Sequence, residues 1–188
     1  MRRALAVVSI PDSELMANVA DGDLQSLGQL FDRYEPHVKR LVVRLGVAVG
    51  DADDVVQDTF LEVVRTASRF DRALPVKNWL LGLAVMLVRR RRRSLSRLAA
   101  RLLQAARLPS PAPPTPAVRL EHNQQLERLE RAFAALSAKK REVFALVTLE
   151  GLSHEEVSRA LDLPVATVRT RLHHARLELR ASLDEVTP

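Results

Sequence analysis

The chain has 188 residues, enough for one larger domain or two small ones, and it carries a formal net charge of +6. Residues are 47% hydrophobic but only 4% aromatic, which favours helices packed through aliphatic side chains. The lack of cysteine in the sequence excludes disulfides, thiolate metal sites and cysteine nucleophiles, and it fits a reducing cytoplasm. The basic excess indicates a polyanionic partner or simply a GC-rich genome, and the placement of the charges has to decide.

Residues 1–22 are predicted to be a loose N-terminal tail with one helical turn. Its basic and apolar start is followed at once by Pro11 and Asp12, without a cleavage pattern, so we do not interpret it as a signal peptide. The apolar run from Trp79 to Val88 has only half of the ~20 residues that a membrane span needs. We therefore expect a buried helix there and no membrane insertion.

Helical spacing of apolar residues begins after Asp23 and predicts a first domain over residues 23–106. Pro36 is expected to interrupt its first helix or to begin a new one, and Asp51 to cap the next. The inward stripe predicted for that next helix is Val56, Phe60, Val63, Val64 and Ala67. Residues 71–78 are predicted to form a loop, with Trp79 opening another helix.

A proline-rich segment follows, at residues 107–119. Five prolines lie between 108 and 118, and proline both lacks an amide hydrogen and biases its neighbour away from helix. This segment is therefore predicted to be a semi-extended linker before a second domain at 120–188. The predicted fold is all-α, with two small helical domains joined by this linker.

The second domain begins with an apolar stripe, followed by two more helix signals. The stripe consists of Leu126, Leu129, Phe133 and Leu136. Ser137 is predicted to cap the next helix, and Gly151 to end it.

A helix-turn-helix is predicted between Ser153 and Arg176. Ser153 and Glu156 match a capping box, a proline lies in the turn at 162–164, and no acidic residue occurs from 165 to 177. The second helix of this motif enters the DNA major groove. Its outward face holds Thr167, Arg169, Thr170, Arg171, His174 and Arg176, with Val168 and Leu172 inside. The alternative is a plain helical hairpin with a solvated basic face, which the three features together disfavour.

Residues 136–183 resemble region 4 of RNA polymerase sigma factors of the extracytoplasmic-function (ECF) kind. The matching motifs are R-E-V-F at 141–144, E-G-L-S-H-E-E at 150–156 and T-V-R-T-R-L-H-H-A-R at 167–176. The resemblance implies that the second helix reads the −35 promoter element. Other helix-turn-helix regulators share much of this half.

Residues 26–93 resemble sigma region 2, with D-A-D-D-V-V-Q-D-T-F at 51–60 followed by R-F-D and a W-L helix. Asp54, Asp58 and Glu62 are spaced at i, i+4, i+8 and form an acidic stripe in a basic protein. Acidic residues in the first turn of a helix can be explained by their interaction with the free amides at its N-terminus. This does not explain Asp58, which lies further along the helix. The resemblance implies that Asp54, Gln57 and Asp58 bind the coiled coil of the polymerase β′ subunit.

The segment around Trp79 corresponds in this resemblance to the part that opens the −10 element. Lys77 and Asn78 are the expected base contacts; Trp79 is a further candidate, although a tryptophan on an apolar helix face is usually core. Met86 and Arg90 stand where many members have Asn and Asp, which bears on the −10 sequence that is recognised.

Five consecutive arginines, Arg89 to Arg93, follow this helix. Complementing a helix dipole needs fewer cations than that, and neighbouring arginines repel one another without counter-anions. We therefore predict phosphate contacts near the −10 region, with Arg89, Arg90 and Arg93 as the candidates.

The resulting prediction is a sigma factor that binds core RNA polymerase, through the β′ coiled coil and the β flap, and directs it to promoter DNA. The resemblance also implies an anti-sigma partner. A helix-turn-helix regulator that acts without polymerase is the alternative. An enzyme is not expected, because the sequence has no glycine-rich phosphate loop and no catalytic or metal-spaced constellation, and no cofactor or metal is expected either.

Overall fold

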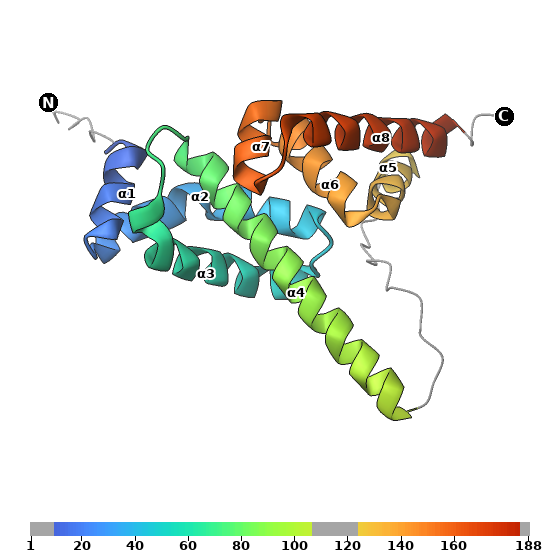
Figure 1. Cartoon of the computed structure of the whole chain (residues 1–188), viewed down its shortest axis with the longest axis horizontal. Helices are drawn as coiled ribbons and strands as arrows, with labels where there is room; N and C mark the ends of the chain where they lie inside the picture. Colours follow the sequence, from blue (N-terminus) through green and yellow to red (C-terminus); the bar gives the residue numbers. More distant parts are fainter. Residues whose placement is uncertain (1–9, 107–123, 185–188) are drawn as a thin grey trace, which may run out of the picture.

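The computed structural model describes residues 10–106 and 124–184, and within them it is built of helices only. The first domain contains α1 (Asp12–Ala20), α2 (Leu24–Arg44), α3 (Val49–Thr66), a 3₁₀ turn η1 (Ala67–Arg69) and α4 (Val76–Ala106). The second contains α5 (Gln124–Ala135), α6 (Ala138–Phe144), a π-helical turn η2 (Ala145–Leu149), α7 (His154–Leu161) and α8 (Val165–Asp184). Figure 1 shows α4 crossing the molecule and its far end projecting away from the body. The predicted linker lies outside the described residues.

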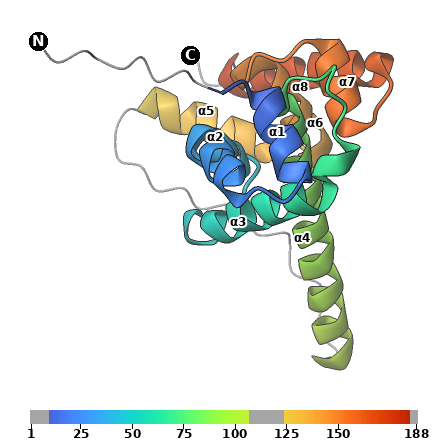
Figure 2. The same cartoon turned by 90° about the vertical axis from the view of Figure 1, so that its left-hand side faces the viewer.

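Helices α2, α3 and α4 pack together around an aliphatic core, and α1 lies against α2 (Figure 2). The core residues include Leu30 and Leu41 of α2, Val56 and Phe60 of α3, and Leu80 of α4. Most are at most a few per cent exposed, so their burial is the main driving force for this domain. The predicted stripe of α3 is confirmed except for Val64, which is 41% exposed.

Helix α1 corrects the prediction that the segment before residue 23 is a tail. Its residues Leu15, Met16 and Val19 are buried against the rest of the domain. Asp12 adds a polar attachment, because its carboxylate accepts hydrogen bonds from Arg33 and from the hydroxyl of Tyr34. The short apolar pattern was too brief to predict the helix from periodicity alone.

Three helix boundaries also differ from prediction. Pro36 lies inside an uninterrupted α2 on its exposed side, so the backbone hydrogen bond that it cannot make is lost where water can reach. Ala48 rather than Asp51 occupies the N-cap position of α3. Helix α4 begins at Val76 rather than at Trp79, and the carbonyl of Pro75 accepts the amides of Asn78 and Trp79.

The second domain is smaller, and its helix ends agree only in part with the predicted signals. Ser137 stands at the N-cap position of α6 but its side chain makes no capping bond. The π-helical turn ends at Leu149, with Glu150 at its C-cap position. Gly151 follows with a φ of 78°, a left-handed conformation that glycine adopts without strain. In the predicted stripe of α5, Leu136 is buried and Phe133 packs on Phe144, whereas Leu129 is 44% exposed.

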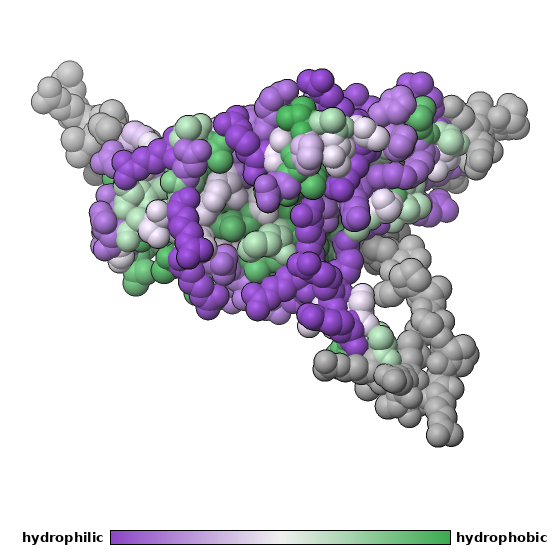
Figure 3. All heavy atoms as spheres, in the orientation of Figure 1, coloured by the Kyte–Doolittle hydropathy of each residue, from purple (hydrophilic) through white to green (hydrophobic). Residues whose placement is uncertain are grey.

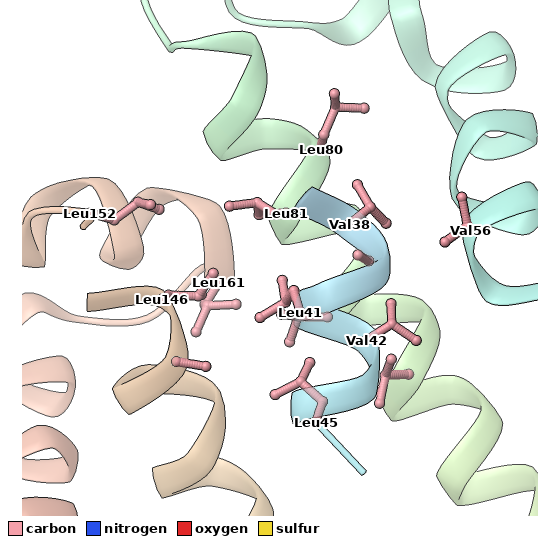
Figure 4. Packing of buried hydrophobic residues seen from close by; sticks show 14 of the residues in the cluster. Val38, Leu41, Val42, Leu45, Val56, Leu80, Leu81, Leu146, Leu152 and Leu161 are labelled. Carbon is pink, nitrogen blue, oxygen red and sulfur yellow. The ribbon is translucent and has the colours of Figure 1, made fainter. Parts of the chain in front are cut away.

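The two domains share one hydrophobic core. Figure 4 shows Leu81 of α4 and Leu41 of α2 next to Leu146 and Leu161 of the second domain. Leu41, Leu81 and Leu146 are at most 1% exposed. The sequence predicted two domains but gave no indication that they are packed against each other.

Candidate nucleic-acid and polymerase interfaces

Helices α7 and α8 form the predicted helix-turn-helix. The Ser153 hydroxyl accepts the Glu156 amide at 3.2 Å and the Glu156 carboxylate accepts the Ser153 amide at 2.7 Å, so the capping box is complete. Asp162 ends α7 in the left-handed conformation, with a φ of 51°. The Ser158 hydroxyl donates to the carbonyl of Leu163 and fixes the turn. These local contacts set the angle at which α8 leaves α7.

Helix α8 has one buried face and one exposed face. Val168, Leu172, Ala175 and Leu179 are at most 6% exposed and hold the helix on the domain. The predicted DNA contacts lie on the other side, and we call them the recognition face: Thr167, Arg169, Thr170, Arg171, His174 and Arg176. Thr167 and Arg171 of this set are half-buried and the other four are exposed. The face can therefore reach a nucleic acid without disturbing the core.

Few contacts within the protein occupy the recognition face. Arg169 lies 3.5 Å from Glu155, with both side chains more than half exposed, so water screens this pair strongly. The Thr170 hydroxyl donates to the carbonyl of Ala166 at 2.9 Å. The described part of the chain contains no group of three residues that could hold a metal ion. The adjacent His173 and His174 therefore have no third ligand beside them among these residues.

A second exposed surface lies on α3 and is acidic. Asp54, Gln57 and Asp58 are exposed, whereas their neighbours Val55, Val56 and Thr59 are buried. We call the three exposed residues the acidic patch. Asp53 beside it pairs with Lys39, whose pKa is raised chiefly by this hydrogen bond. Leu61, one turn after Asp58, is 53% exposed and adds an apolar contact to the same side.

The predicted −10 contacts lie on the first turn of α4 rather than in a loop, and they face the second domain. Asn78 is only 6% exposed and donates to the carboxylate of Glu156 at 2.8 Å. The Lys77 ammonium lies 3.4 Å from the carboxylate of Glu150. Trp79 is half-buried and packs edge-on against Phe70, with ring centroids 5.3 Å apart. In this arrangement the two expected base contacts are occupied by acidic residues.

Three of the five consecutive arginines make contacts within the protein. Arg89 donates to the Glu142 carboxylate at 2.7 and 3.0 Å, Arg91 pairs with Asp51, and Arg92 donates to the Leu45 carbonyl. The sequence predicted that the five arginines are more than the fold itself needs. For Arg89, Arg91 and Arg92 this prediction is wrong, because each has a partner within the protein. Arg90 and Arg93 are exposed, and Figure 3 shows hydrophilic residues gathered where α4 leaves the body.

A groove of about 280 Å³ lies between α4 and α7. Trp79, Met86 and Arg89 line it from the first domain, and Arg159 and Ala160 line it from the second. Met86 is 41% exposed, and Arg90, one turn further along α4, is exposed as well. The two positions that depart from the resembled pattern are therefore both accessible.

Comparison with known proteins decides between the two candidate classes. The family model for sigma-70 region 2 matches residues 30–98, and that for sigma-70 region 4 matches residues 126–179. The RNA polymerase sigma factor CnrH of Cupriavidus metallidurans is 31% identical over 180 residues, which cover 92% of this chain and 94% of that protein. This chain belongs to the ECF sigma factors of RNA polymerase.

A further relative and a solved structure of CnrH agree with this assignment. The ECF RNA polymerase sigma-E factor of Salmonella typhimurium is 31% identical over 177 residues, covering 89% of this chain and 91% of that protein. The solved structure of CnrH in complex with the cytosolic domain of CnrY superposes with a TM-score of 0.68 at 28% identity, covering 94% of this chain and 99% of that one. As an ECF sigma factor, the chain directs promoter-specific transcription initiation, and a regulator that acts without polymerase is not supported.

Sequence reasoning missed the acidic residues at the domain interface. Glu142 and Glu150 have side chains only 2% and 3% exposed, and both pair with cations of the first domain. No local signal identifies such pairs, because the partners are 53 and 106 residues apart. No helix among the described residues is both long and apolar enough to cross a membrane.

Proposed function

We propose that the acidic patch on α3 binds the coiled coil of the polymerase β′ subunit. The observation that carries this proposal is that Asp54, Gln57 and Asp58 are all exposed although the other face of the helix is core. An acidic, exposed surface in a basic protein suits a partner surface of opposite charge and speeds its encounter. The resemblance noted in the sequence points to the same surface.

The test is core binding by the full chain with Asp58→Arg. Asp32→Arg is the matched control, because Asp32 is an exposed acid on α2 outside the patch. We expect a loss of at least tenfold in affinity for core polymerase for the first variant and little change for the second. Binding to promoter duplex should be unaffected. Equal loss of core and duplex binding would refute the assignment.

We propose that promoter contacts are divided between the domains. The recognition face of α8 reads the −35 element, and its exposed basic and hydroxyl side chains support this because they can reach base edges and phosphates. Lys77, Asn78 and Trp79 contact the −10 element, with Arg89, Arg90 and Arg93 on nearby phosphates. The β flap is the further polymerase contact of the second domain. The experiment is transcription from genomic DNA by core polymerase with this protein, read by sequencing the transcript starts.

We propose also that an anti-sigma protein regulates the chain, that the chain acts in the cytoplasm and that it catalyses no reaction itself. The groove between α4 and α7 supports the first point, since a partner seated there would contact both domains at once. The test is to co-purify the chain with the product of a neighbouring gene. Adding that product to a transcription reaction with core polymerase and this chain should then stop transcription. Continued transcription in the presence of the bound partner would contradict it.

A further inference from the structure

The far end of α4 projects from the body of the protein (Figure 1). Arg91 still pairs with Asp51, and Arg92 still donates to the carbonyl of Leu45. Beyond them, every side chain from residue 93 to residue 100 is exposed. We call residues 93–100 the projecting segment; at 1.5 Å per residue it extends the helix by about 12 Å. Packing within the described part of the chain therefore does not explain the sequence of this segment.

The projecting segment carries an apolar stripe. Leu95 and Leu98 are 58% and 54% exposed, and they lie one helical turn apart with Ala99 beside them. Neither leucine belongs to the hydrophobic core of the described residues. In the sequence the same spacing continues at Leu102. A single exposed leucine is common, but leucines repeated along one side of a helix indicate a surface that a partner covers.

Arginines occupy the other side of the same helix. Arg90, Arg93 and Arg97 are all exposed and are spaced at i, i+3 and i+7. Arg93 and Arg97 are each two residues from Leu95, which places them about 160° around the helix from it. The sequence has no acidic residue from 89 to 120. The projecting segment is therefore amphipathic, and its polar side carries positive charge only.

We propose that the projecting segment of α4 binds the surface of a membrane that contains anionic lipids. The helix would lie in the plane of the interface, with Leu95 and Leu98 at the boundary of the acyl chains and the arginines among the headgroup phosphates. Helices with an apolar side and a basic polar side bind membranes in this way. Each cation close to an anionic leaflet adds to the attraction.

A lipid surface accounts for both sides of the helix, which two other partners do not. A nucleic acid would contact the arginines and leave the leucines in water. A second copy of the chain would cover the leucines but would bring two sets of arginines together, which repel each other. Arg90 and Arg93 are also the phosphate contacts proposed above, so membrane and promoter would be bound in turn. Vesicle binding needs no DNA, and its failure would leave the promoter assignments untouched.

The first test is flotation of the full chain with vesicles of phosphatidylglycerol and phosphatidylcholine in equal parts, compared with phosphatidylcholine alone. We expect binding to the mixed vesicles only. Replacing both leucines, Leu95→Ser with Leu98→Ser, should lower the bound fraction roughly fivefold or more, and Arg97→Gln should lower it as well. The controls are Leu24→Ser and Arg69→Gln, because both positions are exposed and lie outside α4; neither should change the binding.

Two results of the flotation test would overturn the proposal. The first is that the natural chain does not float with the mixed vesicles. The second is that Arg97→Gln loses binding while the paired leucine variant keeps it. In that case the helix attracts polyanions by charge alone, as a nucleic-acid contact would, and its apolar stripe takes no part.

The second test asks which side of the helix meets the lipid. The chain has no cysteine, so Leu98→Cys and Ala100→Cys can each carry a nitrobenzoxadiazole label at an exposed position. These two positions are about 160° apart around the helix. On adding the mixed vesicles, the label at 98 should shift its emission to shorter wavelength and brighten, whereas the label at 100 should change little. Equal responses, or a label at 98 that is already shielded without vesicles, would refute the proposed contact.

Discussion

Individual side chains at the domain interface combine apolar packing with paired charges. Leu146 is fully buried and belongs to the core that both domains share. Arg141 is buried as well, and it donates to backbone carbonyls of Leu136 and Ala134 in its own domain and of Leu45 in the other. Burial lowers the pKa of Arg141, but these carbonyls supply acceptors in place of water.

Leu146→Ala is expected to destabilise the protein by about 2–5 kcal/mol, because it removes buried methyl groups and leaves a cavity. Leu177→Ala is the control, since Leu177 is 49% exposed. Urea unfolding followed by circular dichroism measures both changes. Equal, small effects would mean that Leu146 is not part of a packed core.

Glu156 gives the protein an acid-dependent contribution to stability. The backbone amide of Ser153 is the largest cause that lowers the pKa of Glu156 below its ordinary value of 4.5, and Asn78 adds to it. A lowered folded pKa stabilises the protein above the unfolded value, and this contribution is lost as the pH falls through the folded pKa. The free energy of unfolding should therefore decrease as the pH falls below 4.5. In the Glu156→Gln variant it should decrease less steeply. An equal decrease in the free energy of unfolding of the two proteins below pH 4.5 would contradict this.

At the scale of elements, the sequence correctly predicted the caps, turns and helix faces that depend on residues close together in the chain. The capping box and the turn agree with the sequence pattern, because their partners lie within a few residues. The buried face of α8 also agrees, because the spacing of its apolar residues is local although it packs against α5 and α6. The start of α4 was placed three residues too late, because Pro75 was assigned to a loop when its carbonyl in fact accepts the first helical bonds. The occupation of Lys77 and Asn78 could not be predicted, since their acidic partners are 73 and 78 residues away.

Helix α8 should behave as a DNA-reading element whose residues differ in role along its length. Arg171→Ala is expected to weaken binding of the full chain to a −35 promoter duplex by about 1–3 kcal/mol if it contacts a base. Arg180→Ala is the control on the same helix, because Arg180 is exposed beyond the recognition face. Fluorescence anisotropy with a matched and a mutated −35 sequence measures both. Loss of affinity without any loss of sequence preference would make Arg171 a phosphate contact instead.

At the scale of the whole molecule, the charges are segregated although the net charge is positive. Basic side chains lie along α8 and the second half of α4, and the acidic patch lies on α3. The carboxylates of Glu142 and Glu150 in the second domain are turned inward against the first. Paired charges of this kind fix which surfaces meet more than they stabilise the contact, because burying them costs desolvation energy.

The shared core predicts that the two domains unfold together. Trp79 is the only tryptophan of the chain and lies in the first domain beside α7, so its fluorescence reports on that domain, whereas circular dichroism reports on all helices. In urea the two signals should give coincident transitions for the natural sequence. The control Gly28→Ala should behave in the same way, because a Cβ at this position of α2 meets nothing within 4 Å. Gly82→Ala should separate them, because a Cβ at Gly82 would lie 2.6 Å from the carbonyl oxygen of Ala160 in α7 and would disturb the packing of the two domains. Separate transitions in the natural sequence would mean that the interface is too weak to couple the domains.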